Sequence, residues 1–302
     1  MSRPQPTAPG LQFLSLGSAA PWPAPAKLNL CLHIVGRRDD GYHLLQSAIQ
    51  FIDLCDQLTF WQRPAGVVER IAGPKEVPTE SDLSVRAARL LAEHAHARVG
   101  VGIELHKRIP MQAGLGGGSS DAATVLVALN HLWHAGLHMD ELAALGLKLG
   151  ADVPMFVRGR AAWMEGIGEI LTPADFRPAC YLVVKPDAAV GTAEIFNAPE
   201  LTRHTPVTTI RAFRDQAGLL SGRNDCEPVV RNRFPAVAEA LDWLGKYAPA
   251  RLTGTGACVF ATFDDAHTAR RVHAQLPAKW QGFAVQGLNR SPLIDRLAAE
   301  GG

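Results

Sequence analysis

The chain has 302 residues, of which 47% are hydrophobic and 20% charged, so it can form a sizeable core and is not a disordered chain. Thirty lysines and arginines against 29 aspartates and glutamates give a net charge of +1. Nucleic acid binding through bulk positive charge is therefore excluded, and an anionic ligand must be bound at a local site. At roughly 150 residues per domain, the length predicts one large domain or two ordinary ones.

The N-terminal residues, the lengths of the apolar runs and the cysteines together indicate the cellular compartment. Residues 1–24 are rich in proline with Arg3 as their only charge, which predicts an unstructured leader; their short apolar stretch matches a signal peptide poorly. No apolar run approaches the ~20 residues of a membrane helix, so no membrane contact is expected. The five cysteines are scattered without a Cys-x-x-Cys pair, which predicts buried thiols in a reducing compartment. We expect a cytoplasmic protein.

Apolar and polar residues alternate from Lys27 to Val35, which predicts a half-buried strand. Lys27 and Asn29 are two positions apart, so they should lie on the same side of that strand. The turn sequence of residues 36–41 contains Asp-Gly, and the apolar stretch from Leu44 to Leu54 predicts a returning strand.

Helices and strands then alternate along the chain. Periodicity predicts helices over 82–96 and about 120–134, and a third helix from Asp140 to Leu149, with Gly136 ending the second. Strands are expected at 101–110, 181–185 and 259–263. Prolines after residue 171 indicate a domain boundary. We therefore expect an α+β protein with one domain over residues 25–171 and another over 172–302.

Four glycines occupy the five positions 114–118, directly before a predicted helix. Backbone N–H groups of such a loop can point into one cavity, and a helix N-terminus adds partial positive charge, so the loop predicts a phosphate cradle. It is not a Walker A loop, because no lysine or arginine occurs between Arg108 and Lys148. It is not a Rossmann fingerprint, because Ser119 replaces the third glycine. The alternative is a flexible turn with Ser119 as an N-cap, which three consecutive glycines would destabilise.

Other candidate residues are ambiguous alone. Asp152, two residues before a proline, is more typical of a helix cap, and Lys27 of a solvated strand end. His131, His134 and His138 have a spacing that resembles a metal site, but Gly136 should end the helix before the third. We therefore predict no zinc site and assign no side chain as a metal ligand, and no serine or cysteine nucleophile motif occurs.

Three separated segments resemble the three motifs of the GHMP small-molecule kinases: residues 25–30, 110–123 and 252–257. Segments 40–43, 149–154 and 224–227 narrow the resemblance to family members that act on 4-diphosphocytidyl-2-C-methyl-D-erythritol. The resemblance extends from about residue 25 to residue 293. It implies the two-domain GHMP kinase fold, with an N-terminal domain like ribosomal protein S5 domain 2, a ferredoxin-like C-terminal domain, and the site between them.

The resemblance implies phosphorylation of the substrate's 2-hydroxyl by ATP with Mg²⁺, giving the 2-phosphate and ADP, in the non-mevalonate pathway to isoprenoids. Asp152 would be the general base and Lys27 its electrostatic partner. The substrate, a small molecule with a cytidine diphosphate group, would contact Asn29 and Thr192, while Tyr42, His43 and Phe196 would enclose its cytosine. The loop that would hold the ATP phosphates comprises Pro110, Met111, Gln112, Ala113, Gly114, Leu115, Gly116, Gly117, Gly118, Ser119 and Ser120.

Two positions depart from the family pattern. Gln112 stands where the loop normally has a small residue, which predicts a slightly reshaped ATP side. Asp82 stands where asparagine is usual, so no nucleotide contact is expected from it.

Two alternatives remain open: a GHMP kinase for mevalonate, homoserine or a sugar, and a non-catalytic nucleotide-binding protein on the same scaffold. We expect a monomer or weak dimer.

Overall fold

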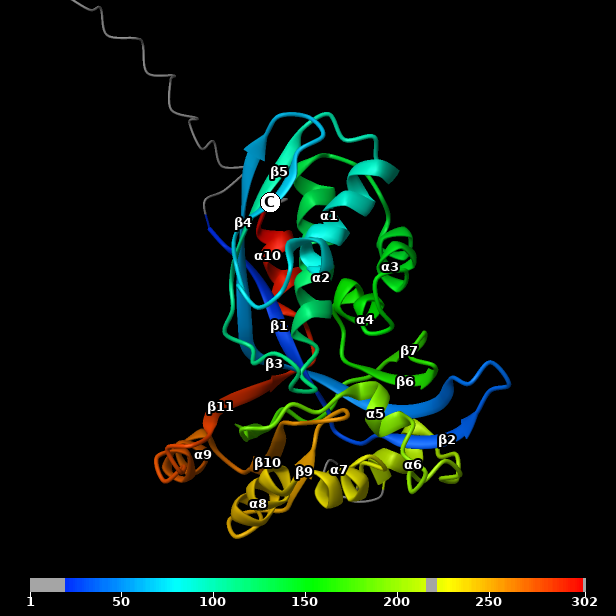
Figure 1. Cartoon of the computed structure of the whole chain (residues 1–302), viewed down its shortest axis with the longest axis vertical. Helices are drawn as coiled ribbons and strands as arrows, with labels where there is room; N and C mark the ends of the chain where they lie inside the picture. Colours follow the sequence, from blue (N-terminus) through cyan, green and yellow to red (C-terminus); the bar gives the residue numbers. More distant parts are fainter. Residues whose placement is uncertain (1–19, 216–221, 301–302) are drawn as a thin grey trace, which may run out of the picture.

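The computed structural model describes residues 20–215 and 222–300. Figure 1 shows two lobes stacked along the long axis of the molecule and joined at a waist. The joining element is β3 (His43–Arg63), a strand of 21 residues. It pairs with five antiparallel strands, β1 (Trp22–Asn29), β2 (His33–Arg37), β5 (Gly100–His106), β6 (Ala162–Gly166) and β11 (Gln281–Leu288).

The sheet continues beyond these strands into both lobes. From β11 it runs through β8 (Cys180–Lys185) and β10 (Val259–Phe263) to β9 (Ala250–Leu252). β4 (Val68–Ala72) lies beside β5, and β7 (Ile170–Pro173) beside β6. The two lobes therefore share one eleven-stranded sheet.

The upper lobe in Figure 1 carries helices from residues 79–158 and one from near residue 300. These are α1 (Leu83–His94), α2 (Gly117–Leu132), α3 (Met139–Leu147), α4 (Val153–Arg158) and α10 (Pro292–Glu300), with the short 3-10 helix η1 (Thr79–Ser81) before α1. The apolar helix α2 is buried from Ser120 to Leu129 and contacts β1, α1 and α4. Its core packs against large side chains of the sheet, including Phe51 and Phe60.

The lower lobe packs its helices on the other part of the sheet. They are α5 (Thr192–Phe196), α6 (Ile210–Asp215), α7 (Glu227–Arg233), α8 (Pro235–Leu244) and α9 (Ala266–His273). Its core includes Ile195, Val230 and Leu241. A third cluster joins the lobes, and in it Leu28 and Ile52 share a core with Phe260.

The α+β fold class is confirmed, with mixed helices and strands in both lobes. The predicted leader over residues 1–24 is wrong for its last residues, because β1 begins at Trp22. That indole is 2% exposed and lies under the Arg296 guanidinium of α10, 5.1 Å from the ring centre. Residues 1–19 lie outside the described part of the chain.

Two expected elements have different bounds. The strand expected from Lys27 to Val35 is divided into β1 and β2, because at Leu32 the backbone pairs instead with residues 223–225. The helix expected from about residue 120 begins at Gly117, because the last glycines form its first turn. The next helix begins at Met139 with His138 as N-cap, not at Asp140.

The division into residues 25–171 and 172–302 stays a prediction, and two features cross it. β7 spans the boundary, and α10, from the very end of the chain, packs on β1 and α2 in the first lobe. The described chain thus leaves the first lobe and returns to it.

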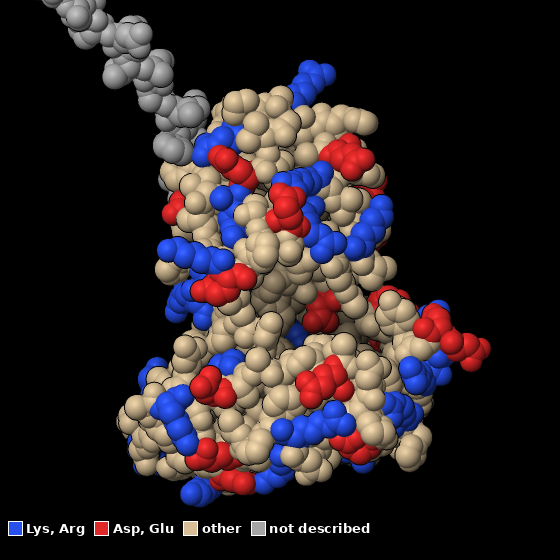
Figure 2. Space-filling view, in the orientation of Figure 1, with Lys and Arg blue, Asp and Glu red and all other residues tan. Residues whose placement is uncertain are grey.

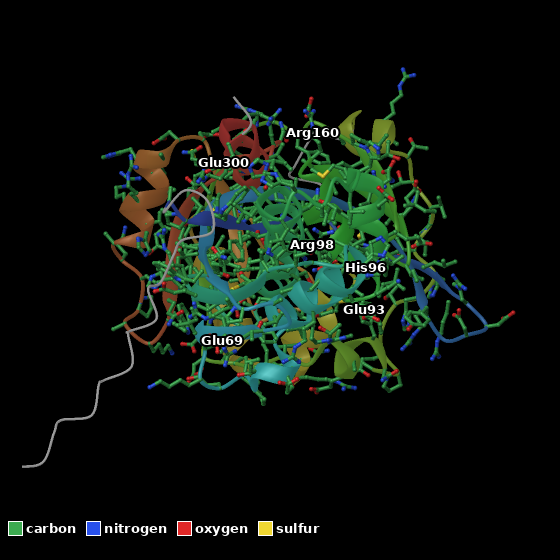
Figure 3. All side chains as sticks on the ribbon, turned by 90° about the horizontal axis from the view of Figure 1, so that it is seen from above. Glu69, Glu93, His96, Arg98, Arg160 and Glu300 are labelled. Atoms are coloured by element: carbon green, nitrogen blue, oxygen red, sulfur yellow. The ribbon has the colours of Figure 1, made fainter. Side chains whose placement is uncertain are left out.

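The surface carries charges of both signs, interspersed on the face shown in Figure 2. Glu93, His96 and Arg98 are exposed around the end of α1 (Figure 3). Among residues 20–215 and 222–300, no three histidine, cysteine or acidic side chains are grouped to hold a metal. No helix in those ranges is long and apolar enough to cross a membrane. All five cysteines are buried and free, as predicted.

Candidate active site

A pocket of about 910 Å³ lies between the lobes, and Figure 2 shows the hollow at the waist. Its lining comes from β1, from the glycine loop, from the start of α4 and from α5 of the other lobe. Lys27, Asn29, Asp152, Thr192 and Phe196 all line it. Five residues from three widely separated segments of the sequence therefore meet in one cavity.

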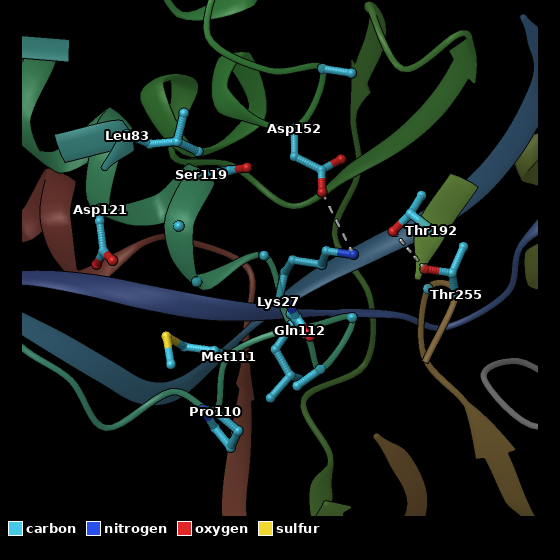
Figure 4. Close-up of a pocket in the computed structure, with 18 of the residues that line it drawn as sticks. Lys27, Leu83, Pro110, Met111, Gln112, Ser119, Asp121, Asp152, Thr192 and Thr255 are labelled. Carbon is cyan, nitrogen blue, oxygen red and sulfur yellow. Dashed lines mark hydrogen bonds and ion pairs between the residues drawn. The ribbon is translucent and has the colours of Figure 1, made fainter. Parts of the chain in front are cut away.

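The Lys27 ammonium group and the Asp152 carboxylate face each other in this pocket (Figure 4). Lys27 Nζ lies 3.9 Å from Asp152 Oδ2, and the two side chains are 5% and 37% exposed. Burial lowers the pKa of Lys27, and the charge of Asp152 opposes that shift. Asp152 stands at the N-cap position of α4 but accepts no capping hydrogen bond. Its carboxylate is therefore available to a ligand.

Lys27 and Asn29 lie on the same side of β1, as predicted, and Asn29 holds the lysine in place. Its Oδ1 accepts a hydrogen bond from Lys27 Nζ, and its Nδ2 donates to Ser47 Oγ at 2.8 Å. The Asn29 N–H donates to Thr253 Oγ1 at 2.9 Å, which brings in the third glycine-containing segment. Because both ends of the Asn29 amide are engaged, this residue orients the lysine in the structure.

The glycine loop lies directly beside this pair. Gly114 and Gly116 have φ angles of +74° and +72°, which L-residues with side chains rarely adopt. A Cβ on Gly114 would lie 2.3 Å from the Thr253 carbonyl oxygen, so only glycine permits this approach. The loop is tied to β1 by the Lys27 N–H, which donates to the Leu115 carbonyl at 3.0 Å.

The cradle ends in the first turn of α2. Gly116 is its N-cap without a side-chain bond, and the Ser120 N–H donates to the Gly116 carbonyl. The earlier N–H groups of a helix have no partner within it and attract anions. The alternative of a turn capped by Ser119 is therefore wrong. Residues 110–119 line the pocket, whereas Ser120 lies buried beneath them.

A buried charge cluster supports the cradle from behind. Lys107 Nζ donates to Asp121 Oδ2 at 2.8 Å and also to Asp56 Oδ2. Burial raises the pKa of Asp121 well above its usual range, and the charge of Asp56 adds to the shift while Lys107 opposes it. Among the described residues, Asp121 Oδ1 and Ser120 Oγ have no hydrogen-bond partner. Lys107 and Asp121 line the pocket, and sequence reasoning did not select them.

The two departures from the family pattern have visible consequences. Gln112 has a φ of +51°, which is rare for a residue with a side chain, and its neighbour Met111 is 43% exposed. Asp82 caps α1, since its Oδ1 accepts from the Ser84 N–H at 2.9 Å, and its Oδ2 accepts from Arg70 at 2.5 Å. Both carboxylate oxygens of Asp82 are therefore occupied within the protein.

The expected substrate residues are only partly together. Thr192 Oγ1 lies 3.0 Å from Thr255 Oγ1 across the pocket from Lys27 (Figure 4). The rings of His43 and Phe196 are stacked with centres 5.1 Å apart. Phe196 lines the pocket, whereas Tyr42 and His43 are not among its lining residues. Tyr42, at the end of the β2–β3 turn, is 61% exposed, and His43 is buried. Thr255 was missed, although it belongs to the third quoted segment.

Comparison with known proteins agrees with this geometry. The GHMP kinases N terminal domain matches residues 82–160, and the GHMP kinases C terminal domain matches residues 207–282. A mevalonate kinase structure from Methanococcus jannaschii superposes with a TM-score of 0.66 at 16% identity, over 90% of this chain and 99% of that one, which shows a shared fold. The chain belongs to the GHMP kinase family.

The particular relatives are more specific. A 4-diphosphocytidyl-2-C-methyl-D-erythritol kinase from Nitrosococcus oceani is 53% identical over 93% of this chain and 99% of its own length. The same enzyme from Alkalilimnicola ehrlichii is 56% identical over 92% of this chain and 94% of its own length. A crystal structure of 4-(cytidine 5'-diphospho)-2C-methyl-D-erythritol kinase superposes with a TM-score of 0.78 at 34% identity, covering 88% of this chain and 98% of that one.

Proposed function

We propose that the protein phosphorylates the 2-hydroxyl of 4-diphosphocytidyl-2-C-methyl-D-erythritol with ATP, in the non-mevalonate pathway to isoprenoid precursors. The observation that carries the proposal is the Lys27–Asp152 pair beside a glycine cradle, in a chain 53% identical to a kinase of this name. A non-catalytic scaffold would have no need of an uncapped carboxylate facing a buried ammonium group.

Asp152 accepts the proton of the 2-hydroxyl as its oxygen attacks the γ-phosphorus of ATP. The bond from phosphorus to the bridging oxygen breaks, and ADP leaves. The Lys27 ammonium group lies beside the Asp152 carboxylate and attracts the hydroxyl oxygen as its negative charge grows. Phosphoryl transfer depends mainly on positioning and charge stabilisation, which the loop N–H groups at residues 116–119 and the α2 N-terminus supply.

The residues at the cradle fit Mg²⁺ bound together with ATP. Ser119 lines the pocket. The Ser120 hydroxyl lies beneath the lining, buried and without a partner among the described residues. Mg²⁺ in kinases is bound largely by phosphate oxygens with few protein oxygens. The Ser119 hydroxyl and the ATP phosphates would hold the ion, and when bound it neutralises charge on the transferred group.

The substrate residues complete the proposal. Thr192 and Asn29 would lie along the methylerythritol, and His43 and Phe196 would hold the cytosine. Tyr42, which is exposed and directly precedes His43, would enclose the cytosine with them. For the cell, we propose a cytoplasmic enzyme, supported by five free and buried cysteines. A monomer or weak dimer stays a prediction.

The direct test is ADP release with purified protein, ATP and one candidate acceptor at a time. The cytidine substrate should give turnover, and mevalonate and homoserine should give none above the ATPase background. The phosphorylated product should be checked by mass spectrometry and phosphorus NMR. Equal turnover with mevalonate would favour a different GHMP kinase, and no turnover with any acceptor would favour a binding protein.

A further inference from the structure

Arg203 lies in the segment between α5 and α6 and binds several groups at the cytosine end of the proposed site. Its Nε–H donates to His43 Nε2 at 3.1 Å. Its Nη1 donates to the Leu201 carbonyl at 3.0 Å, and its Nη2 to the carbonyls of Phe196 at 3.0 Å and Ala198 at 2.7 Å. One guanidinium group therefore fixes a histidine ring and the end of α5 together.

The bond to His43 determines which ring nitrogen carries the proton. An arginine side chain has donors only, so His43 Nε2 must accept with its lone pair. The imidazole is then neutral with its hydrogen on Nδ1. Burial lowers the pKa of His43, and the positive charges of Arg203 and Arg37 lower it further. Among the described residues, none accepts a hydrogen bond from Nδ1.

Arg203 also fixes the aromatic partner of His43. Phe196 lines the pocket, and its ring stacks on the His43 imidazole at an angle of 24°. Because the Phe196 carbonyl accepts from Arg203, the two rings are held relative to each other by the same side chain.

We propose that Arg203 is a positioning residue for base selection: it holds His43 as a neutral donor through Nδ1–H, so that the site prefers cytosine to uracil. The proposal rests on the proposed function. Cytosine N3 is a hydrogen-bond acceptor, whereas uracil N3 carries a hydrogen and is a donor. A fixed donor opposite N3 would bind cytosine and leave two unpaired donors against uracil, and such mismatches discriminate strongly.

The test compares the substrate with its uridine-base analogue in wild type, Arg203→Met and Arg203→Lys. Arg233→Met is the control, because Arg233 pairs with Glu200 nearby and does not contact His43. We expect Arg203→Met to reduce the cytosine-to-uracil ratio of kcat/KM at least tenfold through the KM for substrate. The KM for ATP should stay within twofold, Arg203→Lys should restore part of the ratio, and the control should match wild type.

A second readout is independent of catalysis. Long-range proton–nitrogen NMR, with the His43 signals assigned from their loss in His43→Gln, should show hydrogen on Nδ1 in wild type and a mixture of tautomers in Arg203→Met. If Arg203→Met does not fold, the proposal is tested by the His43 tautomer in wild type and by the cytosine-to-uracil ratio of kcat/KM in Arg203→Lys.

An unchanged base ratio in Arg203→Met, or hydrogen on Nε2 in wild type, would overturn the proposal. Absence of turnover with the cytidine substrate in wild type would instead overturn the proposed function, and base selection with it, whatever the tautomer.

Discussion

Asp152 occupies a cap position without acting as a cap, and this difference separates the two hypotheses that the sequence left open. A carboxylate before a proline usually caps a helix, and the local sequence offers nothing against that. Only the fold brings Lys27, 125 positions earlier in the chain, to 3.9 Å from its oxygen. Because the two residues are so far apart in the sequence, no local pattern could have predicted the contact.

Asp152→Asn should lower kcat by roughly 10²- to 10⁴-fold, the usual effect of losing a general base, with little change in either KM. The melting temperature should not fall, because the carboxylate makes no capping bond. Steady-state kinetics and a thermal melt check both. Asp140→Asn is the control, since Asp140 pairs with Arg158 at an exposed site. A kcat near the wild-type value in Asp152→Asn would show that Asp152 is not the general base.

Lys27 predicts how activity depends on alkaline pH. Burial lowers its pKa below the ordinary 10.5, although Asp152 opposes the shift. The protonated amine is the active form, so kcat should fall as pH rises through this lowered pKa. In Lys27→Arg the charge persists, and the alkaline decrease should disappear although kcat itself is lower. The test is to measure kcat as a function of pH in both proteins, with a thermal melt at each pH to check folding. The same alkaline decrease in wild type and in Lys27→Arg would mean that a group other than Lys27 causes it.

For individual residues, the sequence was informative where the periodicity of a strand or the spacing of two residues determines which way the side chains face. The two-residue spacing of Lys27 and Asn29 correctly placed them on one side of a strand. It failed to select Thr255, and it did not indicate the contact between Arg203 and His43, which are 160 positions apart. The roles of the individual side chains stay predictions until they are measured.

At the scale of elements, the glycine loop and α2 form one unit. The sequence predicted loop followed by helix, but glycine has poor helix propensity, which hid the first turn of α2. Gly116 supplies the left-handed residue at its N-cap. Likewise β3 extends to Arg63, beyond the apolar stretch to Leu54, because neighbouring strands continue to pair with it.

Gly116→Ala should destabilise the protein, because a side chain there disfavours the φ of +72° and its Cβ would lie 2.7 Å from the Phe156 ring. We expect a melting temperature several degrees lower and weaker ATP binding by calorimetry. Gly118→Ala is the matched control, since its Cβ would meet Leu83 at an ordinary 3.5 Å. Its melting temperature should stay or rise, because alanine favours helix. Equal melting temperatures in the two variants would contradict the geometry.

For the whole molecule, segment 224–227 connects the lobes at the site. Asn224 Nδ2 donates to the carbonyls of Leu252 and Gly254, and the Leu252 N–H donates to Glu227. Gly254 in turn lies against Gly114 of the cradle. The sequence marked this segment only through family resemblance, since no periodicity shows that it would support a loop 30 residues further on.

Asn224→Ala should therefore raise the KM for ATP and lower kcat as well as stability, because two buried carbonyls lose their donor at about 1–3 kcal/mol each. Asn130→Ala is a matched control: Asn130 also binds backbone groups, of Leu137, but at the far end of α2. Both variants should melt earlier, and only Asn224→Ala should change KM. Parallel kinetics in the two variants would show that segment 224–227 is not coupled to the cradle.

The buried cysteines have a practical consequence for handling the protein. Burial raises the pKa of Cys31, Cys55, Cys226 and Cys258 to about 12, so these four thiols hold almost no reactive thiolate at neutral pH. Cys180 is also buried. The native protein should resist alkylation and peroxide without added reductant, and iodoacetamide should label it only as fast as it opens. Because bound ATP stabilises the folded state, it should slow that labelling. The rate of thiol labelling would then report ATP binding.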